Sequence, residues 1–497
     1  MDHKIKHVPV THQLGLFGFL MITASMVVSI YAYPTFATSG FSTIFFLLVA
    51  GILWFVPVCL VAAELGTGGQ GWCDAGVFSW GKAAFGARWG FFMIFLQWTE
   101  ISLGFIAMLY FIANGLAYAF DYPALGNPSI LQLVILLIVF WLITLANFLG
   151  TKITKLIATY AFFIGILFPI VVMIILGIAY FSAGNSVQIS FSSHTFFPDF
   201  ASFTALVVLV SFILSYMGPE ASAVHVNHLK NPARNYPLAI LILVLLTVIL
   251  ASLSSLTIAM VIPLKQISLS GGIFEAFLFL FKYYDVAWII YPFSFIIALS
   301  AVGEISSWIN GPIRGIQTAA QDGLLPPYFA KTNKHMMPVR LLVVQAVVVS
   351  LWIVILTLTG MAFGSGNMAF FTAMTVTVIV YLTMYMVLFL SYLALKFKVP
   401  NNVNPRKFNM PVVFGVIVAI VGLLFTLLAF FISFSRPSSV STSIYVGYLI
   451  ALIICYIILI LIPHIIFSLT KNRQQQWLAR IKNDQIGLYH DKEASDD

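Results

Sequence analysis

Long apolar runs separated by short polar segments cover the chain from residue 14 to residue 468. A helix of about 20 apolar residues crosses the hydrocarbon core of a bilayer, so this pattern predicts twelve membrane-spanning helices. Their expected bounds are residues 14–37, 43–64, 90–119, 130–149, 156–181, 201–224, 237–262, 286–313, 338–360, 367–395, 411–434 and 444–468. The apolar segment 266–284 is short and carries Glu275 and Lys282, so it predicts an interfacial helix instead.

The composition agrees with an integral membrane protein and excludes an ordinary soluble domain. The 497 residues are 61% hydrophobic and only 8% charged, whereas soluble domains carry about 25% charged residues. Cys59, Cys73 and Cys455 have no metal-ligand spacing, and the chain contains no Gly-x-Ser-x-Gly, His-Glu-x-x-His or phosphate-loop motif. We therefore expect neither an enzyme nor a cofactor. Despite a net charge of +8, we expect no nucleic acid as a partner.

The positions of the basic residues predict the orientation of the spans. If the N-terminus is cytoplasmic, 21 of the 24 lysines and arginines fall on the cytoplasmic side, as the positive-inside rule requires. The three exceptions are Lys265, Lys282 and Arg436. We expect a bacterial plasma-membrane protein with both termini in the cytoplasm. Its expected parts are an N-terminal tail (1–13), a transport core (14–395, with repeats 14–181 and 201–395), spans eleven and twelve (411–468) and a C-terminal tail (469–497).

Two predicted spans contain sequence that weakens a helix. The first carries small polar residues, β-branched residues and Pro34, and the sixth carries Gly218-Pro219 inside an apolar run. These spans open two predicted five-helix halves, and matched interruptions indicate an inverted-repeat transporter. The broken ends would offer amides to a carboxylate and carbonyls to an ammonium, so a zwitterionic amino acid is the expected ligand. A proline kink absorbed by packing is the alternative.

Five segments carry a resemblance to a known family. They are Tyr31-Ala-Tyr-Pro-Thr-Phe-Ala-Thr-Ser-Gly40, Phe196-Phe-Pro-Asp-Phe200, Tyr216-Met-Gly-Pro-Glu-Ala-Ser222, Asn231-Pro-Ala-Arg-Asn-Tyr-Pro237 and Gly311-Pro-Ile-Arg-Gly315. In combination they resemble the bacterial glutamate/GABA antiporter family of the amino acid–polyamine–organocation (APC) superfamily, over about residues 12–470. The resemblance implies an all-α LeuT-type fold with a 5+5 inverted repeat and alternating access. It also implies exchange of an amino acid for its decarboxylation product, beside a cytoplasmic decarboxylase that consumes protons.

The same resemblance implies where substrate binds. By similarity to the related arginine/agmatine exchanger, backbone amides at the first break would hold the α-carboxylate, and carbonyls at the sixth-span break would hold the amine. The residues at these positions are Val27, Val28 and Ser29 in span one, and Leu214, Ser215 and Met217 in span six. The resemblance further implies ligand contacts for Tyr31 and Trp308, and proton-sensitive gating for Glu220.

Several positions depart from the family pattern. Ala32 stands where glutamate exchangers typically have glutamate, Pro219 where they have valine, and Asn310 where they have an apolar residue. Glu100 replaces an uncharged residue. Residues 471–497 are shorter than the pH-gating plug of the best-known glutamate member, so we expect no such plug.

Four carboxylates fall within or at the ends of predicted spans, where ionisable groups are costly and usually functional. Glu64 lies at a helix end that could reach water, and a structural use is favoured. For Glu100 a ligand pocket and a neutral core acid remain open, with the pocket favoured. Glu220 adjoins the break and is expected to gate. Glu304 is expected, like Glu220, to be a gating or proton-sensitive residue. It precedes Trp308 by one helical turn, so both can face the ligand, with a packing hydrogen bond as the alternative.

The charge pattern favours a cationic substrate, because no lysine or arginine lies inside spans one, three, six or eight to oppose these carboxylates. Aromatic side chains could stack on a ring or hold an ammonium; these are Tyr31, Trp98, Tyr216 and Trp308. We therefore expect histidine/histamine exchange first and tyrosine/tyramine next, supporting acid resistance and proton-motive force. Glutamate/GABA exchange and a proton-coupled symporter remain alternatives, and a channel or receptor lacks support.

His225 and His228 lie just past span six. They could sense cytoplasmic pH, although ordinary loop histidines are the commoner case.

Overall fold

The computed structural model describes residues 15–483, apart from 70, 73–74, 151–158, 202–205, 224–225, 227–228, 365 and 438–439. His225 and His228 lie outside the described residues. The long helices are α6 (Ala87–Ala119), α7 (Ile130–Asn147), α9 (Phe168–Ser182), α14 (Pro232–Val261), α16 (Ile290–Gln321), α17 (Val339–Phe363), α18 (Gly366–Lys398), α19 (Val412–Ile432) and α20 (Thr442–Thr470). Shorter elements are α1 (Leu16–Val27), η1 (Ile30–Ala32), α2 (Tyr33–Ala37), η2 (Gly40–Ser42), α3 (Thr43–Ala50), η3 (Gly51–Phe55), α4 (Val56–Gly66), α5 (Val77–Phe85), η5 (Ala161–Leu167), α10 (Ser193–Phe196), α12 (Leu209–Ser215), α13 (Pro219–Ala223), η7 (Leu264–Gln266) and α15 (Gly272–Tyr283).

The predicted spans correspond to helices in the described chain. Ten helices are long and apolar enough to cross a membrane, and the bent pair Leu16–Ser25 and Ile30–Ala37 adds an eleventh. The sixth predicted span, 201–224, is represented by α12 and α13, each of which is too short to cross alone. The segment 266–284 contains the separate twelve-residue helix α15, which is not a span.

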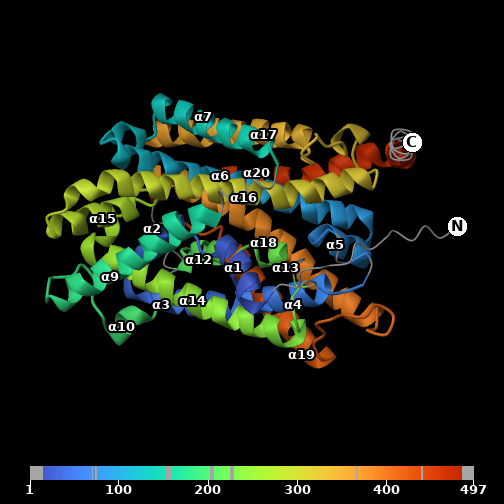
Figure 1. Cartoon of the computed structure of the whole chain (residues 1–497), viewed down its shortest axis with the longest axis horizontal. Coiled ribbons are helices and arrows are strands. Elements are labelled where there is room, and N and C mark those ends of the chain that lie inside the picture. The colour runs from blue at the N-terminus through green and yellow to red at the C-terminus, as the bar shows by residue number, and fades with distance from the viewer. Residues whose placement is uncertain are drawn as a thin grey trace, which may run out of the picture.

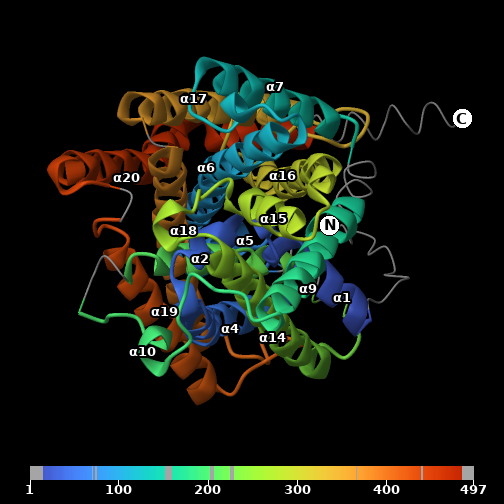
Figure 2. The ribbon, with the colours of Figure 1, turned by 90° about the vertical axis from the view of Figure 1, so that its left-hand side faces the viewer.

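The helices form one bundle around the broken ones. Figure 1 shows α1, α12, α13 and α18 near the centre, with α6 and α16 on one side and α14 on the other. Helices α6, α16 and α18 pack against one another. One end of the bundle carries α10 and α15, which face the viewer in Figure 2, and the other end carries α5. The broken helices are therefore surrounded by continuous ones.

The outer helices expose apolar side chains in the spacing of a single helix face. On α7, Ile138, Leu142 and Leu145 are 54%, 60% and 50% exposed. Contiguous apolar surface of this kind marks contact with a membrane or a partner, and the spacing of three and four residues puts the three side chains on one side of the helix. The bundle is thus built to present hydrocarbon to lipid.

Candidate functional site

The first span breaks between α1 and η1. Val28 and Ser29 have extended backbone, with φ/ψ of −80°/107° and −130°/127°, and the helical segments on either side differ in direction by 45°. Pro34 does not cause the break, because it lies in the first turn of α2, where its missing amide costs no helical hydrogen bond. The free amides begin after Val28, at the start of η1.

The second break separates α12 from α13 at Gly218. Its φ of +109° is unfavourable for any residue with a side chain, and Pro219 is the first residue of α13. Glycine is also required by contact, because a Cβ at this position would lie 2.4 Å from Cη2 of Trp308 on α16. Gly218 therefore both ends the helix and lets the broken span approach the Trp308 ring.

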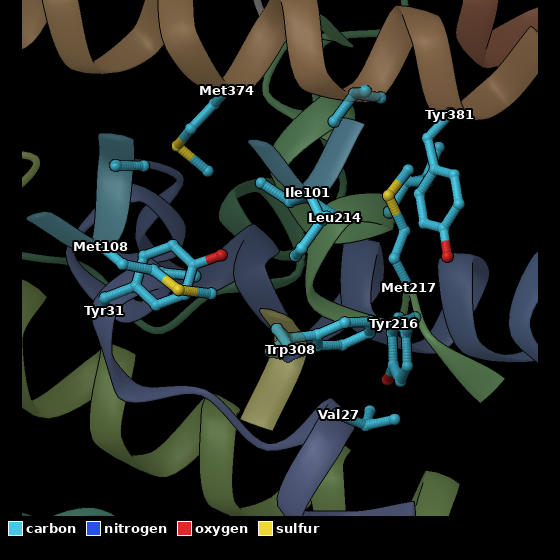
Figure 3. Packing of buried hydrophobic residues seen from close by; sticks show 14 of the residues in the cluster. Val27, Tyr31, Ile101, Met108, Leu214, Tyr216, Met217, Trp308, Met374 and Tyr381 are labelled. Carbon is cyan, nitrogen blue, oxygen red and sulfur yellow. The ribbon is translucent and has the colours of Figure 1, made fainter. Parts of the chain in front are cut away.

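The two breaks meet at a small cavity of about 30 Å³. Figure 3 shows the side chains of Tyr31, Met108, Ile101, Leu214 and Met217 gathered around Trp308. The full wall consists of Val27, Ser29, Tyr31, Ala32, Glu100, Ile101, Gly104, Met108, Leu214, Ser215, Met217, Glu304, Trp308 and Thr377. Since one water needs about 10–15 Å³ of such space, the cavity has room for water but must widen to hold an amino acid.

Two carboxyl groups face this cavity from the neighbouring helices α6 and α16. Glu100 of α6 and Glu304 of α16 are 3% and 6% exposed, and Glu100 Oε2 has no hydrogen-bond partner among the described residues. No lysine, arginine or histidine is part of the described wall. The site is therefore suited to a ligand that brings a positive group or a hydrogen-bond donor.

The structure brings nine of the expected contact residues to the cavity wall. They are Val27, Ser29, Tyr31, Glu100, Leu214, Ser215, Met217, Glu304 and Trp308.

The expectation for the backbone of Val27 and Val28 needs correction. Val27 is the last residue of α1, and the Val28 amide donates to the Ala24 carbonyl at 2.8 Å. The Val28 amide is therefore not free for a carboxylate, and Val28 does not line the cavity. The free amides lie at the N-terminal end of η1, from Ser29 onward, one or two residues later than expected.

Three other expected contacts also lie away from the cavity wall. Trp98 and Asn310 are each two residues from a wall residue, which turns a helical side chain by about 200°. Trp98 packs on Phe95, and the Asn310 amide donates to Asn147 Oδ1 at 3.1 Å. Tyr216 donates its hydroxyl to the Leu47 carbonyl on α3 at 3.1 Å. The Asn310 and Tyr216 hydrogen bonds each connect two helices, whereas the contact of Trp98 with Phe95 lies within α6.

Glu220 lies beyond the cavity in a cluster of hydrogen bonds. Its Oε1 accepts from Gln97 Nε2 at 2.8 Å and from the Tyr381 hydroxyl, and its Oε2 accepts from the Tyr385 hydroxyl at 2.5 Å. Glu220 is 1% exposed. The cluster ties the broken helix α13 to α6 and α18, which is the geometry of a closed contact and not of a ligand site.

Sequence reasoning missed residues on two helix faces. Gly104 and Met108 follow Glu100 at intervals of four along α6, and all three line the cavity. On α18, Thr377, Tyr381 and Tyr385 follow one another at the same interval and therefore share one face. Thr377 lines the cavity, and the two tyrosines donate hydrogen bonds to Glu220. On α18 the available signal was a polar or aromatic residue at every fourth position of an apolar span; on α6 it was only the four-residue spacing of Gly104 and Met108 from Glu100.

A second, larger cavity opens at the end of the bundle that carries α10 and α15. It encloses about 1050 Å³, and we call it the vestibule. Its wall contains Thr35, Thr38, Ser39, Gly40, Phe41, Ser42, Phe46, Gln188, Ile189, Ser190, Thr195, Phe197, Pro198, Asp199, Val207, Val208, Leu264, Lys265, Ile267, Leu269, Asn367 and Phe371. Phe46 belongs to this wall and stacks on the fully buried Phe212, with ring centroids 5.1 Å apart.

Helix α18 orders these features by depth. Asn367 and Phe371 line the vestibule, Thr377 lines the inner cavity, and Tyr381 and Tyr385 hold Glu220. At a rise of about 1.5 Å per residue, the sequence along this helix runs from the open end to the closed end. The inner cavity thus lies between an open vestibule and a hydrogen-bonded closure.

A membrane bundle in which two broken helices meet at a buried cavity is typical of a secondary transporter. The model of the amino acid permease family matches residues 14–462. The chain is 41% identical over 465 residues to a glutamate/gamma-aminobutyrate antiporter of Lactococcus lactis subsp. lactis, covering 93% of this chain and 91% of the relative. The chain belongs to this glutamate/GABA antiporter family of amino acid antiporters, and it is a multi-pass membrane transport protein, not an enzyme.

Other comparisons agree with this assignment. A second glutamate/gamma-aminobutyrate antiporter, from Lactococcus lactis subsp. cremoris, is 42% identical over 461 residues, covering 92% of this chain and 90% of the relative. An uncharacterised transporter of Legionella pneumophila is 32% identical over 430 residues, covering 86% and 90%. A manganese transporter of Eremococcus coleocola has the same fold, with a TM-score of 0.55, 15% identity and coverage of 94% of this chain and all of that one.

Proposed function

We propose that this protein exchanges glutamate for γ-aminobutyrate across a bacterial plasma membrane. The supporting observation is identity of 41% and 42%, over more than nine-tenths of the chain, to two antiporters of that specificity. The histidine/histamine and tyrosine/tyramine pairs favoured by the charge pattern have no support among these relatives. Glu100 and Glu304 line the cavity without a basic residue in its described wall, and the proposed substrates have to be compatible with these two carboxyl groups.

The charges of the cavity wall favour particular protonation states of the two substrates. With Glu100 and Glu304 in the wall and no described cation beside them, a ligand with net negative charge is disfavoured. γ-Aminobutyrate carries an ammonium that either carboxyl can accept. Glutamate fits when its side-chain carboxyl is protonated, which happens near its pKa of about 4.3 in water. Exchange is therefore expected to quicken as the external solution becomes acidic.

The substrate would occupy both breaks at once. The amides at the start of η1, from Ser29 onward, would hold the α-carboxylate, and the carbonyl end of α12 near Ser215 and Met217 would hold the amine. Tyr31 and Trp308 would cover the aliphatic chain. Because the observed cavity is too small for an amino acid, binding requires the flexible Met108 and Met217 side chains to move.

The transport cycle would alternate the exposure of this one site. The vestibule would face the outside and both termini the cytoplasm, as the distribution of lysine and arginine indicates. Opening the other end requires release of the Glu220 cluster. The core would be residues 14–395, with repeats 14–181 and 201–395, while spans 411–468 support it. Exchange beside a cytoplasmic decarboxylase would export the product and support acid resistance and proton-motive force.

Counterflow in proteoliposomes tests the proposal. Vesicles loaded with unlabelled γ-aminobutyrate should accumulate labelled glutamate at pH 4.5, and empty vesicles should not. Uptake into empty vesicles would indicate a uniporter or a proton-coupled symporter. Exchange of histidine for histamine without any exchange of glutamate would overturn the substrate assignment while leaving the antiporter class intact.

A further inference from the structure

Lys265 is an exception to the topology of the chain, since it is one of three basic residues that the positive-inside pattern leaves at the outer end. Arg436 donates to the Val440 carbonyl at 3.1 Å, and Lys282 is exposed on α15, outside the vestibule wall. Lys265 alone of the three lines the vestibule. The positive-inside rule disfavours a lysine at the outer end of the bundle, so Lys265 is expected to have a local role there.

The Lys265 side chain is accessible to solutes in the vestibule. Lys265 lies in η7 and is exposed, and it forms no ion pair or hydrogen bond with any described residue. Element η7 lies beside the turn that follows α2, since a Cβ on Gly40 would be in ordinary van der Waals contact with Cδ1 of Leu264, at 3.5 Å. Lys265, the residue after Leu264, therefore lies near this turn.

Buried hydroxyls in the same wall lack partners. Thr35 is 1% exposed, and its Oγ1 has no hydrogen-bond partner among the described residues; the same holds for Ser39 Oγ. Both residues line the vestibule, and Ser39 directly precedes Gly40. A buried hydroxyl without a hydrogen-bond partner is costly. A carboxylate bound near Lys265 would accept hydrogen bonds from these two hydroxyls.

The two cavities differ in charge. The inner wall carries Glu100 and Glu304 without a described cation, whereas the charged residues of the described vestibule wall are Lys265 and Asp199. Asp199 Oδ1 accepts from the Ala201 amide at 3.0 Å and forms no ion pair with Lys265. An anionic solute is therefore favoured in the outer cavity near Lys265 and disfavoured in the inner one.

We infer that the vestibule is a separate capture site for the anionic form of an amino acid, in which Lys265 binds the side-chain carboxylate before the substrate is protonated and enters the inner cavity. This inference rests on the proposed function, since it takes glutamate as the anionic substrate. Attraction by an exposed lysine raises the local concentration of the anion and speeds its association. It does so strongly only at low ionic strength, where the Debye length is long.

The test uses right-side-out membrane vesicles loaded with γ-aminobutyrate, in which kcat/KM for external glutamate is measured at pH 5.5. At this pH most glutamate carries a net negative charge, because its side-chain pKa is about 4.3. Lys265→Gln should lower kcat/KM for glutamate about threefold at 10 mM salt and have little effect at 300 mM salt. Asp199→Asn should raise it at low salt, and the matched control Lys282→Gln should leave it unchanged.

External γ-aminobutyrate, which has no net charge at this pH, distinguishes capture from damage. All three variants should take it up at the wild-type rate. Provided that the wild type exchanges glutamate, two results with Lys265→Gln would overturn the inference. One is an equal fall in kcat/KM for glutamate and for γ-aminobutyrate, and the other is an unchanged kcat/KM for glutamate at low salt. A wild type that takes up no glutamate would instead overturn the proposed function, and the inference with it.

Discussion

Glu64 Oε1 lies 2.5 Å from Lys396 Nζ, and the two side chains are 0% and 2% exposed. This pair joins the end of α4 to the end of α18. Arg406 NH1 reaches the same oxygen at 2.6 Å, and the Tyr392 hydroxyl and the Met410 amide donate to Oε2 at 2.8 and 3.1 Å. The sequence suggested that Glu64 could reach water, which is wrong, since it is fully buried. The structural role favoured for Glu64 agrees with its contacts to Lys396, Arg406, Tyr392 and Met410.

Loss of the Glu64 charge should destabilise the protein strongly. In Glu64→Gln, Lys396 and Arg406 remain buried without a counter-charge, and breaking a buried pair costs about 3–5 kcal/mol. We expect a clear fall in the thermal unfolding temperature in detergent. Lys82→Gln is the control, because it removes the exposed Lys82–Asp322 pair, with side chains 47% and 34% exposed, which is worth about 0–1 kcal/mol. Equal shifts in the two variants would contradict the prediction.

Gly218→Ala should abolish exchange. A side chain at φ +109° is strained, and its Cβ would overlap the Trp308 ring. We expect counterflow to fall at least about tenfold, since the break and the cavity wall would both be displaced. Gly311→Ala on α16 is the matched control, because its Cβ would meet nothing within 4 Å and alanine favours a helix. Wild-type exchange by Gly218→Ala would show that this contact is not needed.

Changes in the Glu220 cluster should lower turnover and not apparent affinity. Glu220 lies outside the cavity wall and links α13 to α6 and α18, so we expect its hydrogen bonds to act in the closing step of the proposed cycle. In Tyr385→Phe the buried carboxylate loses one charge-assisted bond, worth about 1.5–3 kcal/mol. We expect kcat for exchange to fall about tenfold, with KM within about twofold.

The control for this variant is Tyr456→Phe, whose hydroxyl lies 3.1 Å from Thr383 on α18, outside the cluster. It should exchange at the wild-type rate. A raised KM with an unchanged kcat in Tyr385→Phe would place the cluster in the binding site and refute a closing role.

Removing either cavity carboxylate should weaken the binding of γ-aminobutyrate more than that of glutamate. Glu100 and Glu304 face the inner cavity. The proposed pose puts the α-amine of glutamate at the carbonyl end of α12, whereas the terminal ammonium of γ-aminobutyrate, farther from its carboxyl, is expected to reach one of these two carboxyl groups. We expect Glu304→Gln and Glu100→Gln to raise KM for γ-aminobutyrate about tenfold, which corresponds to about 1.4 kcal/mol, as measured by counterflow with each labelled substrate. Glu275→Gln, on α15 outside the cavity wall, is the control. A larger effect on glutamate would argue against this assignment.

Exchange should depend on external pH through the substrate itself. The neutral form of glutamate becomes about tenfold rarer for each pH unit above its side-chain pKa of about 4.3. If the cavity accepts that form, KM for total glutamate should rise by a similar factor between pH 5.5 and 6.5, whereas KM for glutamine should stay constant. Parallel behaviour of the two substrates would show that the carboxyl enters charged.

The sequence by itself determined the membrane class, the approximate positions of the spans and the second break. The ends were less accurate, since the span predicted at 286–313 continues to Gln321 in α16. Hydropathy is a sum over neighbouring residues, and the conformational preferences of Gly218 and Pro219 act within one helical turn, so both can be read locally. The approximate place of the first break followed from the family resemblance. Of the features expected to weaken this span, the β-branched and small polar residues lie at the break and Pro34 does not. Pro34 starts α2, and the chain bends earlier, at Val28 and Ser29.

Tertiary packing decided which face of each helix reaches the cavity and which polar groups pair. Trp98 and Asn310 are polar or aromatic neighbours of true wall residues, but a helix turns them away by about 200°. Glu64 and Lys396 are 332 positions apart, and no local pattern relates them. The vestibule also arises only where the end of α2, the loop before α10 and η7 come together. Helix rotation and long-range contacts depend on how whole helices pack, because the energy that fixes them is spread over many side chains.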